Sequence, residues 1–165
     1  FVVGTPAPGS AEDEAYHREL KTLVSTSGLE RETTWTGYLF DPTPAYAAMD
    51  VLVVPSISPE GLSLAALEAM QHGVPVIAFA AGGVLEVVQD GMNGILVPPS
   101  NVPALAVALE RVWSDPPLRA RLSEGARATV DSRFAPAAFK KAIRRTALEL
   151  TSSIVTLNAE QIMGS

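Results

Sequence analysis

Short apolar runs alternate with longer amphipathic segments along most of the chain. Runs that read as buried strands lie at residues 1–3, 50–55, 74–79 and 95–97, and a short β-rich run lies at 33–36. Helical patterns between and after them cover residues 10–28, 44–49, 62–72, 82–88, 101–113, 117–131 and 135–153. Strands that alternate with helices in this way predict a doubly wound α/β domain, with a parallel sheet covered on both faces.

Capping and turn residues place several of the predicted boundaries. Ser10 is a candidate N-cap ahead of three acidic residues, and Gly28 and Gly73 are candidate helix stops. The segment 90–94, Asp-Gly-Met-Asn-Gly, is dense in turn residues. Residues 153–165 show only a weak pattern and predict a tail.

Ligands of doubly wound sheets bind outside the carboxyl ends of the strands, which directs attention to the loops 4–10, 37–43, 55–62 and 80–84. In the third of these loops, Gly61 and Leu62 are expected to begin a helix whose free N–H groups suit a phosphate. Glu60 lies at the same edge. It is either part of this site or an ordinary first-turn helix acid.

Glu68 stands well inside the same predicted helix, with alanine and leucine as its sequence neighbours. A carboxylate buried among such residues is costly unless hydroxyl or amide groups satisfy it. Two vicinal hydroxyls, such as those of a ribose, would do so. The alternative is a helix residue that faces solvent.

Composition excludes several classes of protein. The chain has no cysteine and only two histidines, which excludes disulfide scaffolds and zinc modules, and no apolar stretch approaches the about 20 residues of a membrane span. The phosphate-binding patterns G-x-G-x-x-G and G-x-x-x-x-G-K-[ST] and the nucleophile pattern G-x-S-x-G are also missing.

Charge is distributed unevenly around a net value of −6. Residues 1–110 hold 13 acidic and 3 basic side chains, and there is no lysine or arginine between Arg31 and Arg111. A phosphate bound in that stretch must therefore be held by backbone amides or by cations from elsewhere. Residues 111–145, with 9 basic and 3 acidic side chains, form either a solvated helical face or a docking surface. The acidic remainder argues against nucleic acid.

An ordered set of motifs resembles a known family. Glu60 is followed after seven residues by Glu68-Ala69-Met70 and then by His72-Gly73-Val74-Pro75, and further matches lie at 48–56, 82–88 and 90–97. Over residues 1–150 the chain resembles the carboxyl-terminal, donor-binding domain of the retaining glycosyltransferases of family four, which have the GT-B architecture.

The resemblance implies a role for each matching residue. Glu60 would be the catalytic residue beside the transferred sugar, and Glu68 would hold the ribose hydroxyls. The remaining donor-binding positions are Tyr38 and Leu39 near the base, the amides of Ser63 and Leu64 on the diphosphate, and Gly61, Gly82 and Gly83, where backbone approaches closely. The chain departs from the family at Gly61-Leu62-Ser63, where a proline, an aromatic residue and a glycine are usual.

The resemblance also implies an organisation and a set of partners. Residues 1–150 would be a truncated nucleotide-sugar-binding domain and 151–165 a carboxyl-terminal tail. The domain's first strand, its basic Arg and Lys pair and the amino-terminal acceptor domain would precede residue 1. The expected donor is a nucleoside diphosphate sugar, with no separate cofactor and no metal, and the acceptor is a sugar or a lipid-linked molecule. A cytoplasmic location is expected, with peripheral membrane contact as an open alternative.

Two rival functions stay open. A sugar-nucleotide epimerase of similar architecture would need an acid/base residue, for which His72 is the only candidate in the middle of the chain, although a helix-terminal histidine explains it as well. The other rival is a non-catalytic domain that binds nucleotide sugars.

Overall fold

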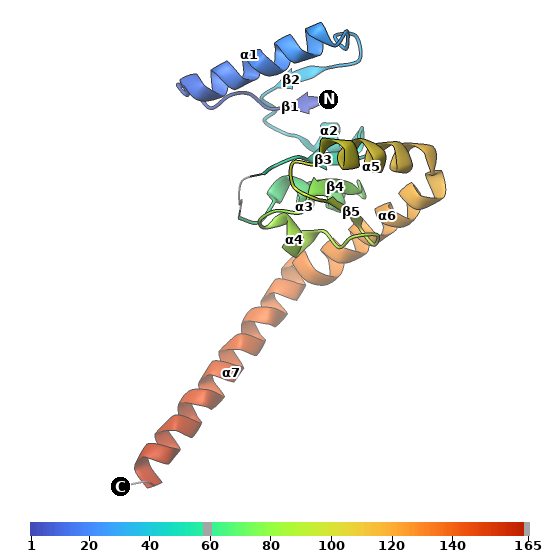
Figure 1. Ribbon diagram of the computed structural model, residues 1–165. Coiled ribbons are helices and arrows are strands. Elements are labelled where there is room, and N and C mark those ends of the chain that lie inside the picture. The colour runs from blue at the N-terminus through green and yellow to red at the C-terminus, as the bar shows by residue number, and fades with distance from the viewer. Residues whose placement is uncertain (58–60, 164–165) are drawn as a thin grey trace. The chain divides into compact units, whose positions relative to one another are not determined.

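A computed structural model describes residues 1–57 and 61–163, which fall into two structural units, 1–48 and 49–165 (Figure 1). The first unit contains strand β1 (Val2–Val3), helix α1 (Ala11–Thr26), strand β2 (Trp35–Gly37) and helix α2 (Thr43–Ala47). Strands β1 and β2 pair in parallel. Helix α1 begins as the sequence predicts, because the Ser10 side chain accepts a hydrogen bond from the Asp13 amide at 3.2 Å.

The second unit is built on a parallel sheet of three strands, in the order β3-β4-β5. Its register places Val53 beside Ile77 and Ile77 beside Ile95. Its elements are β3 (Leu52–Val54), α3 (Leu64–Gln71), β4 (Val76–Phe79), α4 (Val84–Val87), β5 (Gly94–Val97), α5 (Val102–Ser114), α6 (Pro116–Thr129), a π-helix (Val130–Phe134) and α7 (Pro136–Met163). The predicted alternation of strands and helices is thus confirmed in both units.

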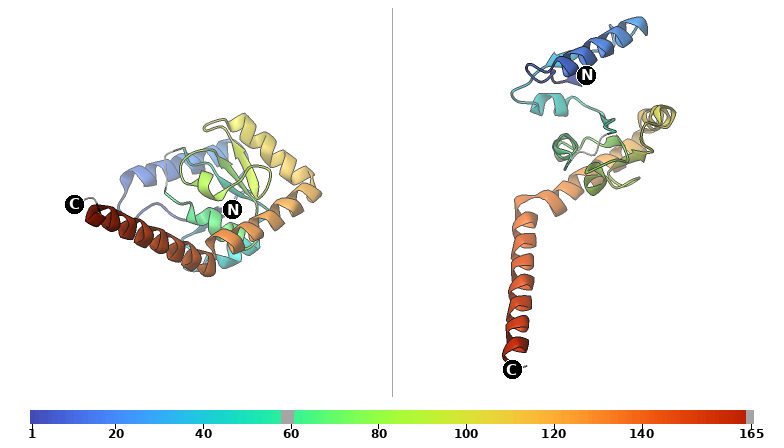
Figure 2. Two further views of the ribbon diagram at one scale, coloured as in Figure 1. Left: turned by 90° about the horizontal axis from the view of Figure 1, so that it is seen from below. Right: turned by 60° about the vertical axis from the view of Figure 1, so that its left-hand side comes forward.

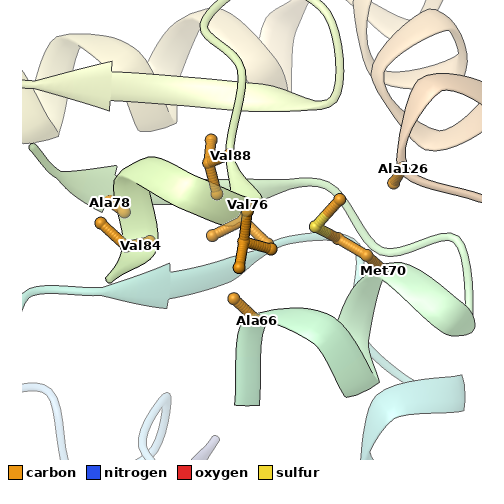
Figure 3. Close-up of a cluster of buried hydrophobic side chains, with 8 residues drawn as sticks. Ala66, Met70, Val76, Ala78, Val84, Val88 and Ala126 are labelled. Atoms are coloured by element: carbon orange, nitrogen blue, oxygen red, sulfur yellow. The ribbon is translucent and has the colours of Figure 1, made fainter. Parts of the chain in front are cut away.

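The central strand β4 is buried on both faces, which is why its sequence is apolar throughout. Val76 and Ala78 project to one face, where they pack with Ala66 of α3 and Val84 of α4 (Figure 3). Ile77 and Phe79 project to the other face. Their cluster is completed by residues of β5, α5 and α6, namely Ile95, Val97, Ala108, Val112, Leu118 and Leu122.

The carboxyl end of α3 is closed by residues of α6. Gly73 has a φ of +74°, the left-handed conformation expected just after a helix. The Arg127 guanidinium donates to the His72 carbonyl at 3.1 Å, and the Ser123 hydroxyl donates to the Gly73 carbonyl at 2.5 Å. A Cβ atom on Gly73 would lie 2.5 Å from Nε of Arg127 and within van der Waals overlap of its other guanidinium atoms.

The turn between α4 and β5 is anchored by Asn93, whose side chain is fully buried. Its Oδ1 accepts from the Gln89 amide at 2.7 Å, and its Nδ2 donates to the Val87 carbonyl at 3.1 Å and to the Thr129 hydroxyl at 3.0 Å. This one side chain therefore joins the end of α4, the turn itself and helix α6.

The last helices differ in detail from the expectation. Helix α6 passes into a π-helix, and Ala135 is extended ahead of Pro136, as a residue before proline prefers. Helix α7 then continues to Met163 rather than ending near residue 153 (Figure 2). Within the described residues, none of the helices combines the length and apolar character that a membrane crossing requires.

Candidate functional site

The loops that follow β3 and β4 meet at the carboxyl edge of these neighbouring strands. A Cβ atom on Gly83, in the second loop, would lie 2.9 Å from the Leu62 amide nitrogen and would overlap the Gly61 carbonyl group. The two backbones therefore touch directly. This contact brings the predicted residues of 61–64 and 82–83 to one place.

Helix α3 begins two residues later than the sequence suggested. Gly61 and Leu62 were expected to begin it, but Ser63 is the N-cap and Leu64 is the first helical residue. Ser63 has the extended backbone typical of an N-cap residue, with a φ of −74° and a ψ of 94°, and the helix begins after it. The unpaired amides of the first turn therefore start at Ser63 and Leu64, the two positions predicted to face a diphosphate.

Ser63 itself is buried, with 6% of its surface exposed, and its side chain makes no capping hydrogen bond to α3. Because the family usually has glycine here, the hydroxyl adds both bulk and a polar group at the helix start. Its side chain is thus one feature in which this site departs from the family pattern.

Glu68 lies on the exposed face of α3, so the structure shows the second of the two alternatives left open for it, a helix residue that faces solvent. The helix turns Ala66, Ala69 and Met70 into the core and leaves Leu64, four residues before Glu68, on the outer face. Residues at this spacing are neighbours, with Cβ atoms about 5–6 Å apart. The first turn of α3 and the Glu68 side chain are therefore presented on the same side of the helix, and a ribose contact by Glu68 stays a prediction.

Gly82 and Gly83 have distinct local reasons for being glycine. Gly82 has a φ of +62°, in the left-handed region that glycine adopts at no steric cost. Gly83 is the N-cap of α4, and the backbone that approaches it is that of residues 61 and 62. The close backbone approach predicted for Gly82 and Gly83 is thus observed at Gly83, where it is a contact between two segments of the protein itself.

Three of the predicted site residues do not belong to the described part of the second unit. Glu60, the predicted catalytic residue, lies outside the described residues. Tyr38 and Leu39 follow β2 in the first unit, where Tyr38 is 74% exposed and Leu39 is half-buried. Their predicted proximity to a nucleotide base stays a prediction.

His72 lies at the opposite end of α3 from the candidate site. It is the C-cap residue, and its Nδ1 is 2.8 Å from the Glu68 carbonyl oxygen. A helix of this length separates its two ends by roughly 12 Å at about 1.5 Å per residue. The helix-terminal explanation of this histidine is therefore confirmed, and its use as an acid/base residue at the start of α3 loses support.

Asn93 holds the end of α4, a role that no sequence pattern indicated. Its bond to the Val87 carbonyl fixes the end of α4, whose other end carries Gly83. Only the position of asparagine within a turn drew attention to it, and the partner Thr129 is distant in sequence.

Known proteins with similar sequences and structures are glycosyltransferases. The family model described as glycosyl transferases group 1 matches residues 1–129. The α-D-kanosaminyltransferase of Streptomyces kanamyceticus is 35% identical over 117 residues, which are 70% of this chain and 30% of that protein.

Two solved structures agree with this. HepE of Anabaena, solved in complex with UDP and also with UDP-glucose, superposes on this chain with TM-scores of 0.81 and 0.78 at 30% identity, over 89% of this chain and 40% of that one. The carboxyl-terminal domain of the group 1 protein LpcC of Francisella tularensis gives a TM-score of 0.68 at 31% identity, over 76% of this chain and 65% of that domain. The chain thus spans well under half the length of the first two relatives, and it belongs to the group 1 glycosyl transferases, a family of GT-B type.

Proposed function

We propose that this chain is the donor-binding domain of a glycosyltransferase that moves a sugar from a nucleoside diphosphate sugar to an acceptor hydroxyl with retention of configuration. In this proposal the amides of Ser63 and Leu64 bind the diphosphate, Glu68 binds the ribose, and Glu60 lies beside the transferred sugar. Tyr38 and Leu39 border the base.

The observation that carries the proposal is the direct contact between the two loops at the carboxyl ends of β3 and β4. It places the start of α3 beside the start of α4, at the edge of the sheet where doubly wound folds bind their ligands. The UDP and UDP-glucose complexes of HepE support a nucleoside diphosphate sugar as the ligand. Since residues 32–110 contain no lysine or arginine, amides at a helix start are the local source of positive potential for a phosphate.

Titration calorimetry of the chain with UDP, GDP, ADP and dTDP, each beside its nucleoside, tests donor binding. We expect at least one diphosphate to bind more tightly than its nucleoside, because the phosphates meet the amides at the start of α3. We also expect no sugar transfer by the chain alone. Equal affinity for each diphosphate and its nucleoside would contradict the proposed site, and transfer by the isolated chain would contradict its role as a donor-binding part only.

The reaction itself is tested with a longer form of the protein that contains this chain. Incubation with UDP-glucose and a panel of acceptor sugars should give a glycoside with the donor's anomeric configuration, read by nuclear magnetic resonance. The inverted anomer would exclude retention. Incubation without acceptor separates the rivals, because an epimerase converts the donor to an isomer whereas a glycosyltransferase or a binding domain does not.

The acceptor, a sugar or a lipid-linked molecule, is proposed to bind outside this chain. The basic residues Lys140, Lys141, Arg144 and Arg145 are exposed on α7. Contact of this helix with an anionic membrane stays a prediction, which sedimentation with anionic and neutral vesicles would test.

A further inference from the structure

Gly83 lies where two backbone segments touch. Of the two glycines at this contact, only Gly83 has no room for a side chain. A Cβ atom on Gly83 would collide with the Gly61 carbonyl group, whereas a Cβ atom on Gly61 would meet no atom within 4 Å. The absence of a side chain is therefore required at residue 83, and the segment Gly61–Leu62 depends on it.

We propose that Gly83 is a positioning residue for donor binding. Its missing side chain lets the Gly61–Leu62 backbone lie directly against the start of α4, and this contact sets the position of the amides of Ser63 and Leu64. The inference rests on the proposed function, because it assigns these amides to the diphosphate. Gly83 acts on the donor through residues 61 and 62 and has no need to touch it.

Helix α4 is held too firmly to retreat from an added methyl group. Its Val84 and Val87 are buried in the cluster shared with Ala66 of α3. Figure 3 shows Val84 in this cluster. Its last carbonyl groups are also bonded, that of Glu86 to the Arg133 guanidinium at 2.9 Å and that of Val87 to Asn93 at 3.1 Å.

Gly61 and Leu62 are exposed, by contrast, so a methyl group on residue 83 displaces them and not α4.

The size of this displacement is large for a hydrogen-bonding site. The Gly61 carbonyl carbon would lie 2.5 Å from the new Cβ atom, and ordinary van der Waals contact begins at 3.4 Å. The Gly61 carbonyl oxygen would lie closer still, so the segment must move by at least about 0.9 Å, which exceeds the spread of about 0.5 Å over which N–H···O distances remain favourable. Ser63 and Leu64 follow directly in the chain, so their amides move away from a bound diphosphate.

The test compares G83A with the wild type in binding UDP and uridine, or the diphosphate and nucleoside pair that the wild type prefers. We expect G83A to bind the diphosphate about tenfold more weakly, as for a lost hydrogen bond to a charged group, and the nucleoside unchanged. A purely structural role for Gly83 would lower the unfolding temperature without changing the ratio of the two affinities.

G73A is the matched control. A Cβ atom on Gly73, at the far end of α3 from Ser63, would also collide with its surroundings, since it would lie 2.5 Å from Nε of Arg127. It should lower the unfolding temperature as G83A does and leave the affinity ratio unchanged. An unchanged ratio in folded G83A, or an equal change in G73A, would overturn the inference.

A milder variant covers the case in which G83A does not fold. V84A removes two methyl groups from the core contact that holds the start of α4 and should lower the same ratio by a smaller factor; an unchanged ratio in V84A would then overturn the inference. Failure of the proposed function is a separate result, because the wild type itself would then show no preference for the diphosphate over its nucleoside.

Discussion

Replacing Asn93 with alanine tests whether one buried side chain holds the end of α4 to helix α6. The substitution removes three hydrogen bonds, of which the bonds to the Val87 carbonyl and the Thr129 hydroxyl are fully buried. Each buried hydrogen bond contributes about 1 kcal/mol, and a buried group left without its partner costs about 1–3 kcal/mol. We therefore expect N93A to lower the free energy of unfolding by about 3–4 kcal/mol.

Urea denaturation followed by far-ultraviolet circular dichroism measures this change. N101A is the matched control, because Asn101 is an exposed N-cap that accepts one hydrogen bond from the Ala104 amide at 3.0 Å. Loss of such a cap costs about 1 kcal/mol. If N93A proves no more destabilising than N101A, the buried network does not anchor the turn and the reasoning is refuted.

Two further predictions concern the donor site. E68A should weaken nucleoside diphosphate binding by about 1–3 kcal/mol in calorimetry on a longer form of the protein, as for lost hydrogen bonds to a charged group, and a loss under about 0.3 kcal/mol would count against a ribose contact. Chelation of divalent metal with EDTA should leave nucleotide affinity unchanged, and a requirement for Mg²⁺ would contradict diphosphate binding by amides alone.

The alternation of strands and helices was predictable because the hydrophobic pattern and the capping residues indicate the same elements. Apolar strands such as 76–79 can only be buried on both faces, and Ser10 and Gly73 mark helix ends by local chemistry alone. The candidate site followed from the fold, since the carboxyl edge of the sheet could be located without coordinates.

The sequence was least informative where sequence neighbours differ from neighbours in space. The alanines adjacent to Glu68 in sequence left open whether it is buried, whereas the helical period turns Ala66, Ala69 and Met70 inward and Glu68 outward. Asn93 lies in a turn as predicted, but its bond to Thr129 could not be inferred, because that partner lies on a helix distant in sequence. The π-helix before Ala135 had no sequence signal other than the following proline.

The cap at the end of α3 limits how this sequence can diverge. A side chain on residue 73 would occupy the space of the Arg127 guanidinium, so the two positions cannot be exchanged independently. A relative with a larger residue at the first position is expected to carry a shorter one at the second. Residues 73 and 127, far apart in the chain, are therefore expected to change together during evolution.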